Sequence, residues 1–171
     1  MKNKAEAKGL DLKVVVIYVG RVTAVKAKGR IFLFRVGVVV GDMKGNVGYA
    51  IAKHSELSEA KEKAIQKAKK SITKIGLRQN RTLHHGVFCK YGASKLLFKP
   101  ANPGTGIIAG GVVRKFCEIA GIRDVIVKSY GSSCPHAMIR NIFQSFREIY
   151  PLKYIATKRG KKVIDIIRNR I

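Results

Sequence analysis

Residues 100–114 read Pro-Ala-Asn-Pro-Gly-Thr-Gly-Ile-Ile-Ala-Gly-Gly-Val-Val-Arg, a glycine cluster that leads into an apolar pattern of helical period. Within it, Gly104, Gly106 and Ala109 match the Gly-x-Gly-x-x-Gly/Ala spacing with which a helix N-terminus holds the pyrophosphate of a dinucleotide. The same glycines could instead be structural, because residues without a side chain let a helix and another backbone pack closely. The rest of the chain has to decide between a cofactor site and a packing element.

Three features of the surrounding sequence argue against the dinucleotide site. Pro100 and Pro103 lengthen the connection before the first glycine, where the fingerprint needs a strand that ends directly at the turn. Asp124 has about the right separation for a ribose-binding carboxylate, but it begins the next predicted strand instead of ending it. No Gly-Lys-Ser/Thr follows, which excludes a Walker-type phosphate loop. We therefore interpret the cluster as close-packing glycine on the first turns of a helix, with Gly106, Gly110 and Gly111 at the approach of another backbone.

The chain is strongly basic, since its 171 residues include 35 lysines and arginines against 10 carboxylates, a formal charge of +25. Both halves carry a similar excess, so the charge belongs to the folded body and not to one arm. With 46% hydrophobic residues the chain can fill a core. A compact protein of this charge repels itself, so we expect a polyanionic partner, and nucleic acid is the favoured one. A membrane is not expected, because the sequence has no long apolar span.

The three cysteines, Cys89, Cys117 and Cys134, are odd in number and too far apart for a Cys-x-x-Cys site. This argues against a disulfide framework and suits a reducing compartment. His84 lies near Cys89, and His136 near Cys134, but neither pair has a complete ligand set or an orienting partner. We therefore expect no metal, no cofactor and no catalytic residue. The N-terminus lacks the apolar stretch of a secretory signal, which predicts an intracellular protein.

The first part of the chain carries three predicted strands followed by one helix. Valine-rich runs separated by turn residues indicate the strands, and an apolar face at three- and four-residue steps, ended by Gly76, indicates the helix. The strands are expected over residues 12–19, 31–40 and 47–52, and the helix over residues 57–75. We place this α+β unit at residues 10–78.

The second part has its own pattern of strands and helices. A strand pair around Gly92 precedes a helix that runs from the glycine cluster to Gly121, and a further strand and helix follow. The strands are expected over residues 83–90, 94–99 and 122–129, and the last helix over residues 135–146. We place this second α+β unit, again one strand layer backed by helix, at residues 79–150, with a basic C-terminal tail at residues 151–171.

Residues 20–30 form a basic segment between the first two predicted strands. Four basic side chains beside Gly29 predict a flexible loop that follows RNA phosphates, with arginine donating in pairs and lysine acting as a point charge. A solvated surface loop is the alternative, but the lysine-rich outer face of the predicted helix and the charge of +25 favour RNA. Nearby aromatic residues could stack on bases, although their strand positions favour the core. The basic residues are Arg21, Lys26, Lys28 and Arg30, and the aromatic ones Tyr18, Phe32 and Phe34.

Five segments occur in the order typical of one protein family. They are Gly-Arg-Val-Thr-Ala-Val-Lys-Ala-Lys-Gly-Arg-Ile-Phe at 20–32, Val-Val-Gly-Asp at 39–42 with Gly-Asn-Val-Gly-Tyr at 45–49, the cluster at 100–114, Lys-Ser-Tyr-Gly-Ser at 128–132, and Lys-Arg-Gly at 158–160. In them the chain resembles bacterial-type small ribosomal subunit protein five over residues 12–166. The run Pro-Gly-Thr-Gly-Ile-Ile-Ala-Gly-Gly is highly specific to that family.

The resemblance implies an α+β fold, with an N-terminal β-β-β-α domain similar to double-stranded-RNA-binding domains and a C-terminal domain with a left-handed βαβ crossover, against the usual handedness. It implies a structural constituent of the small ribosomal subunit that binds small-subunit (16S-type) rRNA, stabilises the head relative to the body and contributes to translational accuracy. The implied neighbours are small-subunit proteins four and eight and the mRNA near its entry channel. The implied location is the ribosome, in the cytoplasm of a bacterium or in the matrix or stroma of an organelle.

The resemblance also assigns residues. The family's basic loop touches rRNA, which maps onto Arg21, Thr23, Lys26, Lys28 and Arg30, and we add Lys44, Asn46 and Lys53 to this rRNA-binding set. The family's contact with protein four maps onto the glycine-rich segment and its terminal arginine, here Gly104, Thr105, Gly106 and Arg114. The alternative hypothesis is a small basic enzyme that binds a phosphorylated cofactor at residues 104–111, but the sequence offers it no convergent acid, base or nucleophile.

Overall fold

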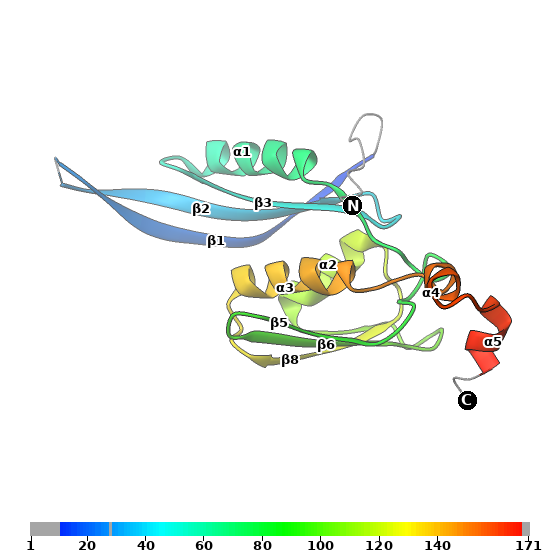
Figure 1. Cartoon of the computed structure of the whole chain (residues 1–171). Coiled ribbons are helices and arrows are strands. Elements are labelled where there is room, and N and C mark those ends of the chain that lie inside the picture. The colour runs from blue at the N-terminus through cyan, green and yellow to red at the C-terminus, as the bar shows by residue number, and fades with distance from the viewer. Residues whose placement is uncertain (1–10, 28, 169–171) are drawn as a thin grey trace.

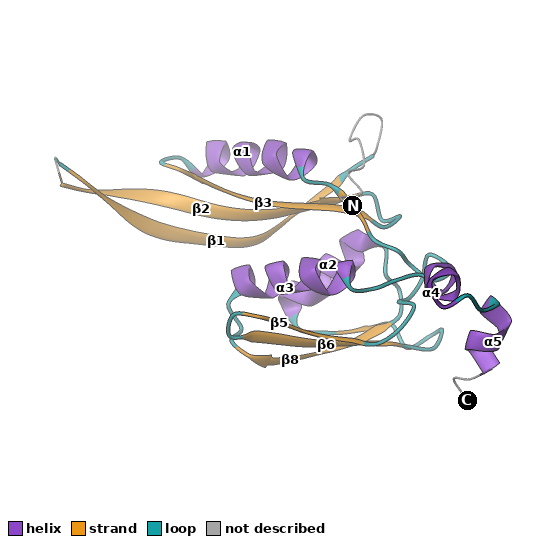
Figure 2. Cartoon of the chain, viewed as in Figure 1, coloured by secondary structure: helices purple, strands orange, loops and turns teal. Residues whose placement is uncertain are grey.

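The computed structural model describes residues 11–27 and 29–168, and it contains two four-stranded sheets that lie roughly parallel to each other (Figure 1). From one side of the molecule to the other, the layers are α1, the first sheet, α2 with α3, and the second sheet (Figure 2). The strands are β1 (Lys13–Lys26), β2 (Gly29–Gly41), β3 (Asn46–His54), β4 (Thr73–Lys74), β5 (Val87–Tyr91), β6 (Ser94–Pro100), β7 (Ile107–Ile108) and β8 (Val125–Gly131). The helices are α1 (Leu57–Lys70), α2 (Gly111–Ala120), α3 (Pro135–Arg147), α4 (Leu152–Arg159) and α5 (Val163–Arg168).

The first sheet has the order β1-β2-β3-β4, all antiparallel, and α1 covers one of its faces. The helix packs through a row of alanines, Ala60, Ala64 and Ala68, against alternate valines of β2. Small side chains allow a close approach, and at Gly48 even a methyl group would overlap the carbonyl oxygen of Ala68. The three predicted strands and the helix that follows them are therefore confirmed, and β4 is an additional strand.

The end of α1 differs from the prediction. The helix stops at Lys70 instead of continuing to Ile75, and Ser71 caps it with a hydroxyl that donates to the carbonyls of Ala68 and Tyr49. Ile72 and Ile75 are buried as expected, but the chain carries them along the sheet edge, where β4 pairs with β3. A buried isoleucine fits either a helix or a strand, so the apolar spacing alone could not locate this end.

The second sheet has the order β5-β6-β8-β7. Its hairpin around Gly92 and the helix that ends at Gly121, which has a φ of 79°, agree with the prediction. β7 and β8 lie side by side and parallel, joined through α2, so they form a βαβ unit. The family resemblance implies such a unit, and the left-handed sense of its crossover stays a prediction.

The two sheets share one hydrophobic core. Val39 and Val47 of the first sheet belong to the same buried cluster as Phe116 of α2 and Ile142 of α3. The turn after β2 also docks on the end of α2, where the Met43 amide donates to the Ile119 carbonyl at 3.1 Å and the Gly45 amide to that of Ala120 at 3.1 Å. We expected two units that each bury their own sheet on their own helices. The first sheet is instead covered on both faces, and the boundaries at 10–78, 79–150 and 151–171 stay a prediction.

Gly121 offers a test of the docking between the two halves. A Cβ there would overlap the Met43 carbonyl, and φ is 79°, whereas Gly160 ends α4 with a φ of 60° and open space around it. Gly160→Ala is expected to cost about 1 kcal/mol through backbone strain alone. Gly121→Ala adds overpacking and should cost roughly 2–4 kcal/mol of unfolding free energy in a urea titration. Equal costs for the two variants would show that the contact with Met43 contributes nothing.

Candidate nucleic-acid interface

The basic segment at residues 20–30 is a β-hairpin and not a flexible loop. β1 and β2 are paired from Lys13↔Gly41 to Lys26↔Gly29, with one irregularity at Ile17, and the ladder is unbroken from Tyr18↔Gly37 to the turn. In Figure 1 the paired ends of the two strands project past the end of α1. The prediction of a loop is wrong because Val22, Val25 and the apolar run opposite them favour extended structure, and each strand satisfies the backbone of the other. Lys28 lies outside the described residues.

The hairpin places three of the predicted rRNA-binding residues on one face. Arg21 lies opposite Phe34, Thr23 opposite Phe32 and Arg30 opposite Val25, and residues directly opposite each other project from the same side of a sheet. This is the side that carries Val36, which packs toward α1. Lys26 pairs with Gly29 and belongs to the other side. We call the side with Arg21, Thr23 and Arg30 the arginine face of the hairpin.

The arginine face is positive and carries an exposed ring. The guanidinium carbon of Arg21 lies 4.8 Å from the ring centroid of Phe32, a cation–π distance. Phe32 is 56% exposed, so its assignment to the core is wrong. Neither β1 nor β2 contains an aspartate or glutamate, so the two strands leave their basic side chains without a carboxylate of their own. Guanidinium groups, a hydroxyl and a stacked ring suit phosphate, ribose and base contacts.

The other predicted rRNA-binding residues lie apart from the arginine face. Lys44 is exposed in the turn at the opposite end of β2, and Lys53 is exposed on β3 opposite Arg35, on the side of the sheet that carries Lys26. Asn46 closes that turn, because its side-chain amide donates to the Asp42 carboxylate at 2.6 Å. The structure therefore brings Arg21, Thr23 and Arg30 together and gives Asn46 an intramolecular hydrogen bond.

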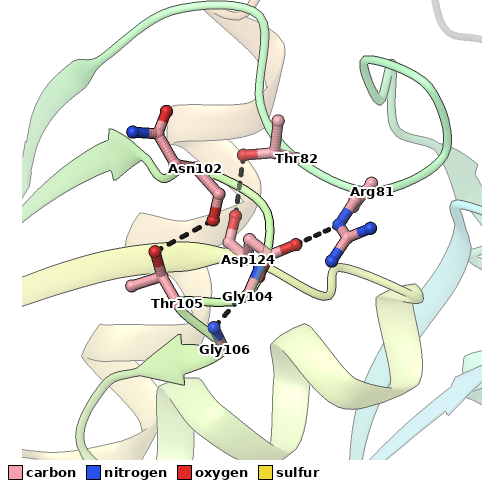
Figure 3. Close-up of polar contacts among 7 residues, drawn as sticks. All are labelled: Arg81, Thr82, Asn102, Gly104, Thr105, Gly106 and Asp124. Carbon is pink, nitrogen blue, oxygen red and sulfur yellow. Dashed lines mark hydrogen bonds and ion pairs between the residues drawn. The ribbon is translucent and has the colours of Figure 1, made fainter.

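The glycine-rich segment encloses a carboxylate from its own chain. The backbone amides of Gly104 and Gly106 both donate to Oδ1 of Asp124 at 3.0 Å, and Nε of Arg81 binds Oδ2 (Figure 3). Asp124 is only 2% exposed. The hydrogen bond from Arg81, followed by that from Gly106, holds the pKa of Asp124 below its ordinary value. The loop thus has the amide donors of an anion site, and Asp124 occupies them.

This arrangement corrects two interpretations of the glycine cluster. A Cβ added at any of its glycines would meet no atom within 4 Å, so close packing is wrong as their explanation within this chain. Two of them are needed for their backbone conformation, with φ of 96° at Gly104 and 72° at Gly106. Strand β7 also lies between Gly106 and α2, so Gly104 and Gly106 do not stand at a helix N-terminus. The glycines with this open space around them are Gly104, Gly106, Gly110 and Gly111.

The predicted protein-contact residues lie near one another in this region but differ in exposure. Gly104 and Thr105 are exposed, while Gly106 is half-buried beside Asp124. The Thr105 hydroxyl donates to the Asn102 carbonyl at 2.9 Å, which stiffens the tip of the segment. Arg114 is exposed on the first half of α2 and lies 3.5 Å from Glu118, a surface pair of little energetic weight.

A groove of about 430 Å³ lies between the first sheet and α3. The hydroxyl of Tyr49, one of its lining residues, lies 2.9 Å from Nδ1 of His136. Burial raises the pKa of Tyr49 to about 12, and burial, followed by the charges of Arg35 and Arg140, lowers the pKa of His136. Both shifts favour the neutral form of the group concerned. The groove is lined by Tyr49, Ser71, Thr73, Tyr91, Arg140, Phe143, Gln144 and Arg147.

Across the described residues, no group of three or more histidine, cysteine, aspartate or glutamate side chains is placed to hold a metal ion. The helices within residues 11–27 and 29–168 include none that is both long and apolar enough to cross a membrane.

Comparison with known proteins identifies the family. The model described as ribosomal protein S5, N-terminal domain, matches residues 12–76, and the model described as ribosomal protein S5, C-terminal domain, matches residues 89–159. The chain belongs to the ribosomal protein S5 family. The predicted fold class is thereby confirmed, and the chain is a structural protein of the small ribosomal subunit and not an enzyme. The hypothesis of a cofactor-binding enzyme is wrong.

Relatives in the S5 family match along the whole chain. Small ribosomal subunit protein uS5 of Neorickettsia sennetsu is 50% identical over 171 residues, which cover 100% of this chain and 99% of the relative. The protein of the same name from Ehrlichia canis is 48% identical over 160 residues, covering 94% and 92%. That of Wolbachia pipientis is 45% identical over 160 residues, covering 94% of each chain.

Asp124→Asn tests the carboxylate in the glycine loop. Because the pKa of Asp124 is lowered on folding, its ionised form stabilises the protein above the unfolded pKa of about 3.9, and this contribution disappears as the pH falls through the lower folded value. The variant should therefore melt at a lower temperature than the wild type near pH 7, and the difference should shrink below about pH 4. Asp165→Asn removes an exposed carboxylate as the control. A gap in melting temperature that does not change with pH would contradict the assignment.

Proposed function

We propose that this S5-family protein binds the 16S-type rRNA of the small subunit through the β1–β2 hairpin. The observation that carries the proposal is the arginine face, where Arg21, Thr23 and Arg30 project together from two strands that contain no carboxylate. Lys26 and Lys53, on the other side of the sheet, and Lys44, in the turn after β2, are further proposed contacts, and Lys28 and Asn46 complete the proposed rRNA-binding set. Paired donors on arginine bind phosphate oxygens in a fixed geometry, so the face both attracts RNA and orients it.

The β-structure of the hairpin favours this function over a solvated loop. A paired ribbon holds its side chains in place before RNA arrives, which lowers the entropy lost on binding compared with a flexible loop. Its base is clamped by the core, where Val38 and Val40 of β2 pack on α1 and Val39 packs toward α2 and α3. A hairpin whose base is fixed in this way can hold the RNA at its tip in a constant position relative to the core. We propose that it thereby helps to stabilise the head of the subunit relative to the body.

The glycine-rich segment is the proposed contact with small-subunit protein four, through Gly104, Thr105, Gly106 and Arg114. Support comes from its exposed backbone, which Asp124 holds in one conformation from beneath. We further propose small-subunit protein eight and the mRNA near its entry channel as neighbours, a contribution to translational accuracy, and the ribosome of a bacterial cytoplasm as the location. The bacterial relatives support that location.

A salt titration of rRNA binding tests the arginine face. Arg21→Ala combined with Arg30→Ala should weaken binding about tenfold or more at moderate salt and reduce the slope of log affinity against log salt by about two, because two phosphate contacts are lost. Lys158→Ala with Arg159→Ala removes the same charge from α4 as a matched control. Arg21→Ala with Lys26→Ala removes one charge from each side of the hairpin. Its affinity, compared with that of the first variant, shows whether the arginine face contributes more than the other side. If neither hairpin variant changes affinity or slope beyond the control, the hairpin is not the rRNA-binding element.

Arg114 and its neighbour Lys115 offer a test of the protein contact. Both are exposed on α2, and the pairing of Arg114 with Glu118 is a surface pair, so neither substitution should change the melting temperature noticeably. Arg114→Ala is expected to weaken binding to small-subunit protein four by about tenfold, whereas Lys115→Ala leaves it unchanged. The affinities can be compared by calorimetry with the purified proteins. Equal effects of the two substitutions would remove Arg114 from the contact.

A further inference from the structure

Within residues 11–27 and 29–168, one face of the second sheet carries no helix. Helices α2 and α3 lie on the side that faces the first sheet, and the other side is open in Figure 1. Along β5, buried Val87 and Cys89 alternate with exposed Phe88 and Lys90, as expected for a sheet with one covered face. We call the side that carries Phe88 and Lys90 the outer face.

Two large rings are exposed on the outer face. Phe88 of β5 is 57% exposed and Tyr130 of β8 is 51% exposed. They lie on opposite sides of β6, whose Leu97 and Lys95 lie between them. Exposed rings on a sheet are the platforms on which single-stranded nucleic acids stack their bases.

The charge of the outer face is entirely positive. Lys90, Lys95, Lys99 and Lys128 are exposed on its strands. None of the four strands β5 to β8 contains an aspartate or glutamate. A protein partner that covered this face would have to supply carboxylates for four ammonium groups, whereas an RNA backbone supplies phosphates at every nucleotide.

The strand register sets each ring beside a lysine. Phe88, Leu97 and Lys128 occupy one row across β5, β6 and β8, and Lys90, Lys95 and Tyr130 occupy the next row on the same face. Neighbouring strands are about 4.8 Å apart, so a ring and a lysine in one row lie roughly 5–10 Å apart at the backbone. A single nucleotide can bridge such a pair, with its base on the ring and its phosphate at the ammonium group.

We propose that the outer face binds single-stranded RNA. Bases stack on Phe88 and Tyr130, and phosphates lie at the four lysines. Duplex RNA does not offer its bases for stacking, so the face selects unpaired segments. This surface is distinct from the hairpin and belongs to the other sheet, and it gives the protein a second RNA contact beyond the rRNA contact proposed above.

The test compares two probes on the full chain by fluorescence anisotropy. One is a labelled oligouridylate of about 12 nucleotides, and the other is a ribose-phosphate chain of equal length without bases. Wild-type protein should prefer the oligouridylate. Phe88→Ala with Tyr130→Ala should weaken oligouridylate binding about tenfold or more and leave the abasic probe unchanged. Lys90→Ala with Lys95→Ala should weaken both probes, because both carry phosphates.

Three controls make the test decisive. Tyr154→Ala removes an equally exposed ring, 50% exposed, from α4 and should have no effect. Phe88→Trp with Tyr130→Phe keeps two rings and should restore the preference for bases. Arg21→Ala with Arg30→Ala should lower rRNA binding but keep that preference, so failure of the hairpin and failure of the outer face are distinguishable.

Two outcomes would overturn the proposal. One is a wild-type protein that binds both probes equally. The other is a ring-deleted variant that keeps its oligouridylate affinity but loses a ribosomal protein partner, which would make the outer face a protein-docking surface. Since both rings are largely exposed, the melting temperature should be the same in every variant.

Discussion

The hydrogen bonds around Asp124 hold together three segments that are far apart in the chain. Its carboxylate accepts from Gly104, Gly106 and Arg81, and its backbone carbonyl accepts from the Thr82 hydroxyl at 2.7 Å (Figure 3). These bonds fix β7 beside β8 and therefore set where α2 begins. The other end of α2 receives the turn after β2. A buried carboxylate at one end of α2 and the turn after β2 at the other end thus both help to position the first sheet on the second.

The shared core explains how a strongly charged arm can be rigid. A sheet covered on both faces, by α1 and by α2 with α3, buries alternate valines of β2 in two separate clusters. Burial on both sides fixes the register, because a slip of one residue would exchange the two sets of valines. The paired strands then continue past the core as the hairpin. Packing at the base of the hairpin therefore determines which side chains lie on the arginine face.

The sequence predicted most of the elements but not the contacts that position them. Valine-rich runs and turn glycines located the strands, and the apolar spacing from Pro135 located α3. The sequence does not predict the ion pair between Arg81 and Asp124, because the two residues are 43 positions apart and only the fold brings them together. The glycine cluster was misinterpreted because a missing side chain can serve either close packing or a positive φ, and only backbone angles separate these causes. The charge of residues 20–30 indicates a loop, but the extended propensity of Val22 and Val25 favours the paired strands that the structure shows.

Three of the carboxylates in the described residues make contacts within the chain itself. Asp42 closes the turn after β2, Asp124 holds the glycine loop, and Glu59 pairs with Lys63 at 3.0 Å. What remains is a basic surface that the protein does not neutralise, on the hairpin and on the second sheet alike. Folding therefore proceeds against self-repulsion, which phosphates would relieve in the proposed RNA contacts. If the proposed RNA binding holds, a protein of charge +25 built in this way is stabilised by the RNA that it binds.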